Sequence, residues 1–302
     1  MTIRRVGFVG VGNMGNPMAG QLARKGFEVT VFDARPEVAQ AFVQEHGGRA
    51  AATVADAGRG MDAVMFMVPD DKVVRAVLLE QGLADALPRG AVVVDMSTSD
   101  PRGTVETGGL LAARGLAMVD APVMGGVVFA KDATLDIMAG GDPAVVERCL
   151  PLFNAIGRQV FRCGPLGSAH VLKALANYVN ACALANVVEA MTVGAKFGLD
   201  QKVMADALVS MCAGRQHPLE KKVIPQVLTR KFATGMALGF IAKDVKIAVD
   251  TAHSIGAAVP LGERVAEVWL DAAEKVGARA DHTEIARYWE QASGVTLDTT
   301  KA

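Results

Sequence analysis

The stretch that decides the fold is Val6-Gly-Phe-Val-Gly10-Val-Gly12-Asn-Met-Gly15, near the start of the 302-residue chain. Its first residues form a short apolar run, which is typical of a buried strand. Met14, Met18 and Leu22 then recur every four residues, as they would on one face of a helix. A strand, a Gly-x-Gly-x-x-Gly turn and a helix together form the fingerprint of a dinucleotide-binding site.

Each glycine of this turn has a physical reason. Gly10 permits the tight turn, Gly12 lets the backbone approach a pyrophosphate, and Gly15 lets the helix pack closely on the strand. Asn13 and Met14 complete the turn, and we expect all five residues to contact the cofactor. The helix N-terminus would then face the phosphates with unpaired N–H groups and the positive end of its dipole.

A second predicted strand ends in Asp33, 18 residues after Gly15. A carboxylate there accepts hydrogen bonds from the adenosine ribose and repels a 2′-phosphate, which favours NAD over NADP. Arg35 would partly offset that repulsion, so NADP is retained as a second cofactor. An S-adenosylmethionine enzyme also uses a glycine-rich first turn and stays open as a minor alternative.

Outward from this motif, short apolar runs alternate with helical patterns, which predicts a doubly wound Rossmann-type α/β domain over residues 1–164. The pattern predicts strands at 5–9, 28–32, 63–68, 91–95, 117–120, 135–139 and 159–161. It predicts helices near 13–25, 36–46, 70–80, 100–114 and 143–156. Continuous apolar runs such as Ala91-Val-Val-Val94 are expected of strands buried on both faces of a parallel sheet.

The strand pattern stops after Phe161, and residues 165–302 are predicted to form an all-α domain for substrate binding and oligomerisation. It opens with a long interdomain helix from about 168 to 197, and further helices are predicted near 200–212, 218–230, 240–254, 260–276 and 281–291. Asp281-His-Thr-Glu284 is a capping box for the last of them.

Composition excludes several classes of protein. Lys and Arg total 31 against 32 Asp and Glu, and this near-neutral balance does not suit a nucleic-acid binder. The apolar run 174–188 holds three Asn and is too short to span a bilayer, which predicts no membrane partner and a cytoplasmic protein. Four widely spaced cysteines are expected to be free buried thiols, and the five histidines form no metal-binding pattern.

Lys173, Asn177 and Asn180 lie on one face of the otherwise apolar long helix. Buried without partners they would cost several kcal/mol, roughly 2–7 for each neutral polar group. The stripe is therefore either exposed or faces a polar cleft, where a partly desolvated Lys could exchange protons near neutral pH. Spacing alone leaves these two interpretations level. His170 lies three residues before Lys173 and could be near that cleft, but its position favours a polar residue at a helix start.

Four segments in order resemble the β-hydroxyacid dehydrogenase family, the group around 3-hydroxyisobutyrate dehydrogenase and tartronate semialdehyde reductase. They are the cofactor segment from Gly7 to Ala19, Asp120-Ala-Pro-Val-Met-Gly-Gly126, Gly167-Ser-Ala-His-Val-Leu-Lys173-Ala-Leu-Ala-Asn177 and Lys243-Asp244. The likeness covers essentially the whole chain. It implies hydride transfer between NAD and a small 3-hydroxy acid of the 3-hydroxyisobutyrate or glycerate kind, with a semialdehyde or keto acid as the oxidised form.

The resemblance also implies roles for single residues. Lys173 would be the catalytic acid/base, and Asn177 would hold the substrate. Gly125 and Gly126 would offer backbone N–H groups to its carboxylate, and Lys243 would reach both cofactor and substrate. Val68, Pro69 and Thr98 would line the ribose and nicotinamide side of the cofactor, and homodimers or homotetramers would be the assembly.

This sequence departs from the family pattern at positions that bear on the substrate. Met124 stands where the family usually has Ser, which removes a hydroxyl from the predicted carboxylate site. A hydrogen bond to a charged group is worth roughly 1.5–3 kcal/mol, so the usual substrate need not be the preferred one. Ala169 replaces a frequent Gly, and Ala176 and Gln216 each replace a frequent Asn.

Two alternatives stay open from the sequence. One is a reductase of imines or of another carbonyl on the same fold, with Met124 marking the change of substrate. The other is a non-catalytic dinucleotide-binding protein, which fold alone does not exclude. The pair Lys173 and Asn177 favours an enzyme, since a sensor would not need an acid/base.

Overall fold

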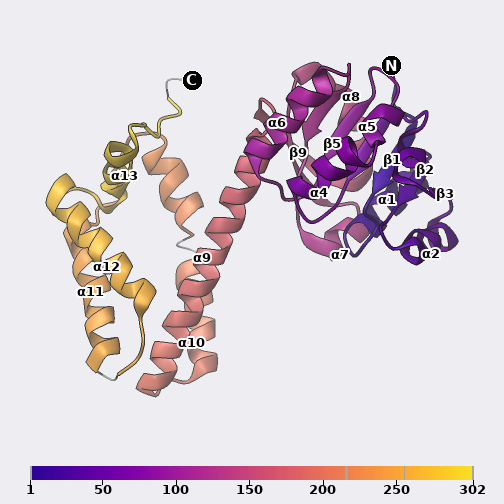
Figure 1. The fold of residues 1–302 in the computed structure, drawn as a ribbon. Coiled ribbons are helices and arrows are strands. Elements are labelled where there is room, and N and C mark those ends of the chain that lie inside the picture. Colours follow the sequence, from indigo (N-terminus) through magenta and orange to yellow (C-terminus); the bar gives the residue numbers. More distant parts are fainter. Residues whose placement is uncertain (1, 215–216, 255, 301–302) are drawn as a thin grey trace. The chain divides into compact units, whose positions relative to one another are not determined.

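The computed structural model describes residues 2–214, 217–254 and 256–300. Internal contacts divide the chain into two units, Met1–Val179 and Asn180–Ala302 (Figure 1). The dividing point falls inside one continuous helix, α9 (Ser168–Phe197), rather than in a loop. Each unit is described by itself below.

Nine strands form one sheet in the described part of the first unit, in the order β3-β2-β1-β4-β5-β6-β8-β7, with β9 beside β8. They are β1 (Arg5–Val9), β2 (Glu28–Phe32), β3 (Arg49–Ala50), β4 (Ala63–Phe66), β5 (Val92–Asp95), β6 (Ala117–Asp120), β7 (Val123–Met124), β8 (Leu135–Gly140) and β9 (Gly157–Gly164). The first six strands are parallel, which confirms the doubly wound Rossmann-type sheet.

The far edge of the sheet is not parallel. Strand β8 runs antiparallel to both β6 and β7, so the expectation of a parallel arrangement is wrong there. Only residues 125–134 connect β7 to β8, whereas a parallel crossover needs a dozen residues or more. The strands β3 and β7 were not predicted, because two residues give no periodic signal.

Helices cover both faces of this sheet (Figure 1). They are α1 (Gly15–Arg24), α2 (Pro36–His46), α3 (Val54–Gly58), α4 (Asp71–Arg75), α5 (Leu83–Ala86), α6 (Pro101–Ala112), α7 (Gly126–Lys131) and α8 (Pro143–Ile156). The helix expected at 70–80 is instead α4 followed by a π-helical segment, Ala76–Glu80. Asp142 caps α8 by accepting the N–H groups of Ala144 and Val145, with Pro143 at the first helical position.

The core of the first unit lies in two layers, one on each face of the sheet. Along β4, Ala63 and Met65 belong to the layer beside α1 and α8, while Val64 and Phe66 belong to the opposite layer. Alternation along one strand therefore buries every residue of it, as the continuous apolar runs predicted. Because β1 to β6 are parallel, their carboxyl ends lie at one edge of the sheet, where ligand-binding loops begin in folds of this kind.

The described part of the second unit is helical apart from one isolated bridge, Ala237 to Asp281. After α9 come α10 (Gln201–Leu208), the π-helical segments Val209–Gly214 and Leu219–Val227, α11 (Leu238–Ser254), α12 (Pro260–Ala272), the π-helical segment Ala273–Gly277 and α13 (Ile285–Ser293). The ordinary α-helix expected near 218–230 is wrong, and Pro225 inside it lacks the N–H that an α-helix would use. The capping box at Asp281 and Glu284 is present, and it caps a short 3₁₀ turn before α13.

Helix α9 is 30 residues long, and among the described residues it alone is long and apolar enough to cross a membrane by length and composition. The uncharged run 174–188, which by itself is too short to span a bilayer, forms the middle of this helix. Cys149 is buried and Cys163 half-buried, but Cys182 and Cys212 are exposed, so the expectation of buried thiols is wrong for the last two.

Candidate functional site

The glycine-rich turn between β1 and α1 has no room for side chains at two of its three glycines. Gly10 has a φ of 90°, and a Cβ atom there would overlap the carbonyl oxygen of Met67. A Cβ at Gly15 would overlap the carbonyl oxygen of Gly10. At Gly12, by contrast, an added Cβ would meet open space. The turn is thus packed from inside and open at the position where a pyrophosphate would approach.

The open side of the turn borders a cavity of about 640 Å³ lined by Gly12, Asn13, Asn16, Arg35 and Lys131 among others. No acidic residue stands in the first turn of α1, and the lining of the cavity holds one carboxylate, that of Glu45, beside the two cations Arg35 and Lys131. Two cations and a free helix N-terminus suit a diphosphate. The residues present therefore fit a dinucleotide.

Asp33 lies at the carboxyl end of β2, where its carboxylate already accepts two backbone hydrogen bonds. Oδ2 accepts the N–H of Val11 at 3.0 Å, and Oδ1 accepts the N–H of Arg35 at 3.1 Å. The guanidinium of Arg35 is 3.7 Å from Oδ1 and largely exposed. Each carboxylate oxygen can accept a second hydrogen bond, so Asp33 fixes the glycine-rich turn and keeps capacity for ribose hydroxyls.

Val68, Pro69 and Thr98 lie in the loops that follow the neighbouring strands β4 and β5. The N–H of Val68 donates to Oγ of Ser97 at 3.0 Å, which ties the two loops together. Pro69 and Thr98 are exposed. The structure therefore brings these three residues to the same edge of the sheet as the glycine-rich turn, since β1, β4 and β5 are parallel.

Lys173 is the candidate acid/base, and it is 9% exposed on α9. Its Nζ donates to the carbonyl oxygen of Val123 at 2.6 Å and lies 3.7 Å from Sδ of Met124. Burial lowers the pKa of the Lys173 ammonium from its usual value. The side chain is thus directed at the middle of the predicted substrate segment, Asp120 to Gly126.

Gly125 and Gly126 follow Met124 and begin the short helix α7. Both have positive φ values, 131° and 76°, which favour glycine. Both are exposed, and an added Cβ at Gly126 would meet open space. The structure therefore brings Lys173, Met124 and the two glycines together, with backbone N–H groups at the N-terminus of α7.

The remaining predicted residues are exposed or lie outside the described residues. Asn177 is exposed one turn after Lys173 on α9. Lys243 is exposed on α11 in the second unit, and its approach to cofactor and substrate stays a prediction. Gln216 lies outside the described residues. None of the described residues form a group of three or more His, Cys, Asp or Glu suited to a metal ion.

Three buried polar residues of the first unit were not named as site residues from the sequence. Asp95 and Asp120 end the adjacent strands β5 and β6, and His170 lies on α9 three residues before Lys173. The two carboxylates are 0% exposed and His170, in the first turn of α9, is 1% exposed. His170 is therefore a residue of the helix start, as expected, but a fully buried one. The available signal was an acidic residue at the end of an apolar strand, as in Val92-Val-Val-Asp95 and Met118-Val-Asp120.

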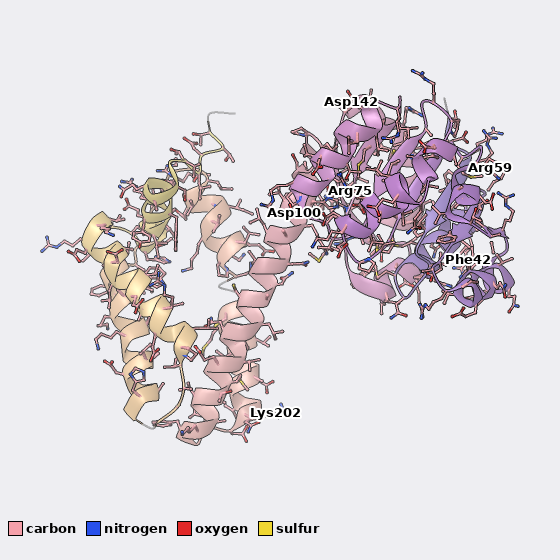
Figure 2. All side chains as sticks on the ribbon, viewed as in Figure 1. Phe42, Arg59, Arg75, Asp100, Asp142 and Lys202 are labelled. Atoms are coloured by element: carbon pink, nitrogen blue, oxygen red, sulfur yellow. The ribbon has the colours of Figure 1, made fainter. Side chains whose placement is uncertain are left out.

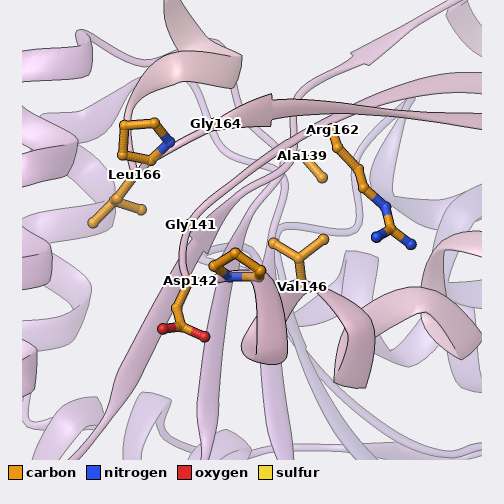
Figure 3. A pocket seen from close by; sticks show the side chains of 9 residues that line it. Ala139, Gly141, Asp142, Val146, Arg162, Gly164 and Leu166 are labelled. Atoms are coloured by element: carbon orange, nitrogen blue, oxygen red, sulfur yellow. The ribbon is translucent and has the colours of Figure 1, made fainter.

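An apolar cavity of about 570 Å³ lies elsewhere in the first unit and contains no predicted site residue (Figure 3). Its two charged side chains are both engaged within the protein. Asp142 accepts the N–H groups at the start of α8, and Arg162 pairs with Glu147. We therefore assign the candidate site to the edge with the glycine-rich turn and Lys173.

A Rossmann-type sheet, an open glycine-rich turn and a buried lysine at the same sheet edge define a dinucleotide-dependent oxidoreductase. Two family models match the chain in succession. Residues 5–164 match the NAD-binding domain of 6-phosphogluconate dehydrogenase, and residues 167–289 match the NAD-binding domain of NADP-dependent 3-hydroxyisobutyrate dehydrogenase.

Individual proteins give the same result. The chain is 30% identical to an NAD-dependent L-serine dehydrogenase of Pseudomonas aeruginosa, over 97% of this chain and 100% of that one. A solved 3-hydroxyisobutyrate dehydrogenase of Mycobacterium tuberculosis with L-serine is 26% identical at a TM-score of 0.66, covering 96% of this chain and 99% of that one. An imine reductase of Myxococcus stipitatus shares the fold at a TM-score of 0.84 and 18% identity, covering 96% and 100%.

The chain belongs to the β-hydroxyacid dehydrogenase family. It is accordingly an NAD(P)-dependent hydroxyacid dehydrogenase, which confirms the resemblance found in the sequence. The sensor and S-adenosylmethionine alternatives are thereby set aside.

Proposed function

We propose that the protein oxidises a small 3-hydroxy acid reversibly, with NAD as the preferred cofactor and Lys173 as the acid/base. The observation that carries this proposal is the buried ammonium of Lys173 at the middle of the predicted substrate segment, 2.6 Å from the carbonyl oxygen of Val123. The same edge of the sheet carries the glycine-rich turn that fits the dinucleotide.

Lys173 would exchange the proton of the substrate hydroxyl. Its lowered pKa raises the fraction of neutral amine near neutral pH, and this amine accepts the hydroxyl proton during oxidation. The ammonium returns a proton to the carbonyl oxygen in the reverse direction. The carbonyl of Val123 accepts one N–H of Lys173 and so orients Nζ. A bound nicotinamide would supply the hydride acceptor for the oxidation and the hydride donor for the reduction.

The substrate carboxylate would be held by backbone N–H groups of Gly125 and Gly126, with Asn177 as a further polar contact. Met124 offers only a weak acceptor, its sulfur, at a position where relatives usually offer a hydroxyl. We expect this thioether to favour a substrate with an apolar or compact group beside the carboxylate. 3-Hydroxyisobutyrate, glycerate and L-serine are 3-hydroxy acids that differ at that group, so they form the core of the test.

The deciding experiment is a panel of 3-hydroxy acids incubated with NAD⁺ and, separately, with NADP⁺. We expect the appearance of reduced cofactor with at least one of these acids, and a higher kcat/KM with NAD⁺ because of Asp33. Lys173→Ala should lower kcat by about 10²–10⁴-fold, the usual contribution of a positioned acid/base. Full activity of Lys173→Ala would contradict the proposed mechanism.

A matched control separates chemistry from folding. Lys202→Ala removes an exposed lysine of α10 and should leave kcat unchanged. The cofactor affinity of Lys173→Ala, measured by NADH fluorescence, should stay within about threefold of that of the unmodified protein. A threefold change corresponds to less than 1 kcal/mol of binding free energy.

The second candidate is reduction of cyclic imines, and Met124 is the observation that favours it. An imine needs no carboxylate site, so an apolar side chain at this position would cost nothing there. Cyclic imines with NADH and NADPH therefore join the panel. Turnover of imines with no turnover of hydroxy acids would select this candidate.

We also propose that the protein is soluble and cytoplasmic and assembles as a dimer or tetramer. Along α9 the side chains of Leu184, Val187 and Val188 are exposed, and extended apolar surfaces of this kind mark interaction sites. Light scattering on the purified protein should give a mass of two or four chains. A monomer at all accessible concentrations would contradict this part of the proposal.

A further inference from the structure

Two buried carboxylates lie side by side at the carboxyl edge of the sheet. Asp95 and Asp120 are paired in the register of β5 and β6, and both are 0% exposed. The imidazole of His170 lies close to both. Its Nε2 is 3.8 Å from Oδ2 of Asp95, and its Nδ1 is 3.9 Å from Oδ2 of Asp120. We refer to these three residues as the Asp95–His170–Asp120 cluster.

Asp120 holds the first turn of the helix that carries Lys173. Its Oδ1 accepts the N–H of Gly167 at 2.9 Å, and its Oδ2 accepts the N–H of His170 at 2.8 Å. A helix N-terminus has N–H groups without partners, and a carboxylate there is favourable. The start of α9 is therefore fixed to Asp120 at the end of β6. Val123, whose carbonyl accepts the hydrogen bond from Nζ of Lys173, follows Asp120 by three residues.

Asp95 organises the loops on the predicted cofactor side. Its Oδ1 accepts the N–H of Ser97 at 2.9 Å, and its Oδ2 accepts the hydroxyl of Ser99 at 2.7 Å. Thr98 lies between these two serines, and Oγ of Ser97 accepts the N–H of Val68. One carboxylate thus sets the backbone on both sides of Thr98 and, through Ser97, the position of Val68.

His170 joins the two halves of this arrangement. Nδ1 of its ring is 2.8 Å from Oγ1 of the buried Thr104 on α6, while Nε2 has no hydrogen-bond partner among the described residues. Burial raises the pKa of Asp95, and the neighbouring imidazole acts in the opposite direction. An incompletely paired buried cluster contributes little net stability. Its position between the acid/base helix and the cofactor loops indicates a role in geometry.

We propose that His170 is a positioning residue that sets Lys173 relative to the loops bearing Val68 and Thr98. This inference rests on the proposed role of Lys173 as the acid/base. Hydride transfer and proton transfer occur at neighbouring atoms of the substrate, so both need the two sides of the site in register. His170 fixes that register without touching substrate or cofactor.

The test is a pair of variants that each restore half of the imidazole. The amide nitrogen of Asn can occupy the place of Nδ1, which faces Thr104, and that of Gln the place of Nε2, which faces Asp95. His170→Ala should lower kcat on the order of 100-fold, as misplacement by about 1 Å does. KM should change little, and His170→Asn or His170→Gln should recover at least part of the lost kcat.

The isotope effect gives a readout that a purely structural role would not move. With substrate deuterated at the hydroxyl-bearing carbon, the isotope effect on kcat should rise in His170→Ala, because hydride transfer becomes the slow step. Leu152→Ala in α8 is the control, since it removes a fully buried side chain of the same unit away from the cluster. It should lower Tm without changing kcat or the isotope effect.

Thr104→Val keeps the side-chain volume but removes the partner of Nδ1, and it serves if His170→Ala does not fold. It should lower kcat while Tm is largely kept, and an unchanged kcat would overturn the inference. A kcat of His170→Ala equal to that of Leu152→Ala would overturn it as well. If Lys173→Ala is inactive while the His170 variants keep the kcat of the unmodified protein, only this inference is refuted. If Lys173→Ala is active, the proposed function is refuted.

Discussion

The two units of the chain bury their apolar residues to different extents. In the first unit, Val92, Val93 and Val94 are all 0% exposed, because helices cover both faces of the sheet. In the second unit, α10 has no buried residue, and the buried cluster consists of Val249, Ala252, Ala257, Val259 and Ala266. The sheet buries its apolar side chains under its own helices, whereas the helices of the second unit leave apolar side chains exposed that another surface could cover.

The largest expected effect contrasts a buried and an exposed leucine. Leu111→Ala on α6 should lower the free energy of unfolding by about 2–5 kcal/mol, because it leaves a cavity in the core of the first unit. Leu184→Ala on α9 should cost no more than about 0.5 kcal/mol in an isolated chain. Urea unfolding measures both values.

Protein concentration sharpens this contrast. If a second copy covers α9, Leu184→Ala should become more destabilising as the protein concentration rises, since association stabilises the folded state. A large cost at every concentration would contradict the exposed position of Leu184. A cost that stays small throughout would contradict the proposed assembly through this face.

The next effect concerns the glycine-rich turn of the first unit. Gly12→Ala should leave Tm unchanged, because the added methyl group meets open space in the protein alone. It should weaken NADH binding about tenfold or more, which corresponds to about 1.4 kcal/mol. Gly15→Ala is the matched variant and should lower Tm, because its methyl group overlaps the carbonyl of Gly10. NADH affinity unchanged by Gly12→Ala would remove the turn from the cofactor site.

A pH effect on stability is expected from His282 in the second unit. His282 accepts a hydrogen bond from Nζ of Lys222 at 2.8 Å and contacts Oγ1 of Thr234 at 2.8 Å. Burial and the charge of Lys222 lower the pKa of His282. The unfolded chain therefore binds this proton at a higher pH than the folded chain. Stability should be complete above the ordinary pKa of histidine and should fall as the pH decreases from there toward the folded pKa.

Thermal unfolding across that range, with His282→Gln as the control, measures this effect. The control lacks the titrating ring, so its Tm should not fall in the same window. Asp281 should contribute only at lower pH. Burial acts to raise its pKa, but hydrogen bonds from Thr283 and Thr234 outweigh burial and hold it well below its usual range. A parallel fall in Tm for both proteins would assign the effect to another group.

The smallest effect is expected at the surface of the second unit. Lys202 and Asp206 form an exposed pair one turn apart on α10, and Figure 2 labels Lys202. Lys202→Ala should change the free energy of unfolding by at most about 0.5 kcal/mol, and added salt should remove the difference. A larger, salt-insensitive loss would mean that this part of α10 is not solvated.

Elements with a repeating pattern were predictable from the sequence. The strands β1, β2 and β6 and the helices α2, α8 and α9 begin and end at the predicted residues, because apolar periodicity and end signals such as Asp142-Pro143 define them. The π-helical segments were not predictable, because a change from one hydrogen-bond spacing to another leaves the apolar pattern nearly intact. The reversal of β8 depended on the length of its connection rather than on its composition.

The site was predictable where residue type alone carries the chemistry. The glycines of the first turn and Lys173 fall in this group as candidates, and their roles stay predictions. The Asp95–His170–Asp120 cluster was not predicted, because its members come from segments that are distant in sequence and meet only through the strand register. The carbonyl of Val123 gave no signal in the sequence, since every residue offers the same backbone carbonyl group.

The continuous helix α9 limits where recombination can exchange domains between members of this family. The family models divide the chain between residues 164 and 167, whereas its contacts divide at Val179. Lys173 lies between these two points. A recombination event at the first point would carry the proposed acid/base away with the helical half and leave the glycine-rich turn behind. A crossover after Val179 would keep Lys173 with that turn and would exchange the helices that follow, including the one that bears Lys243.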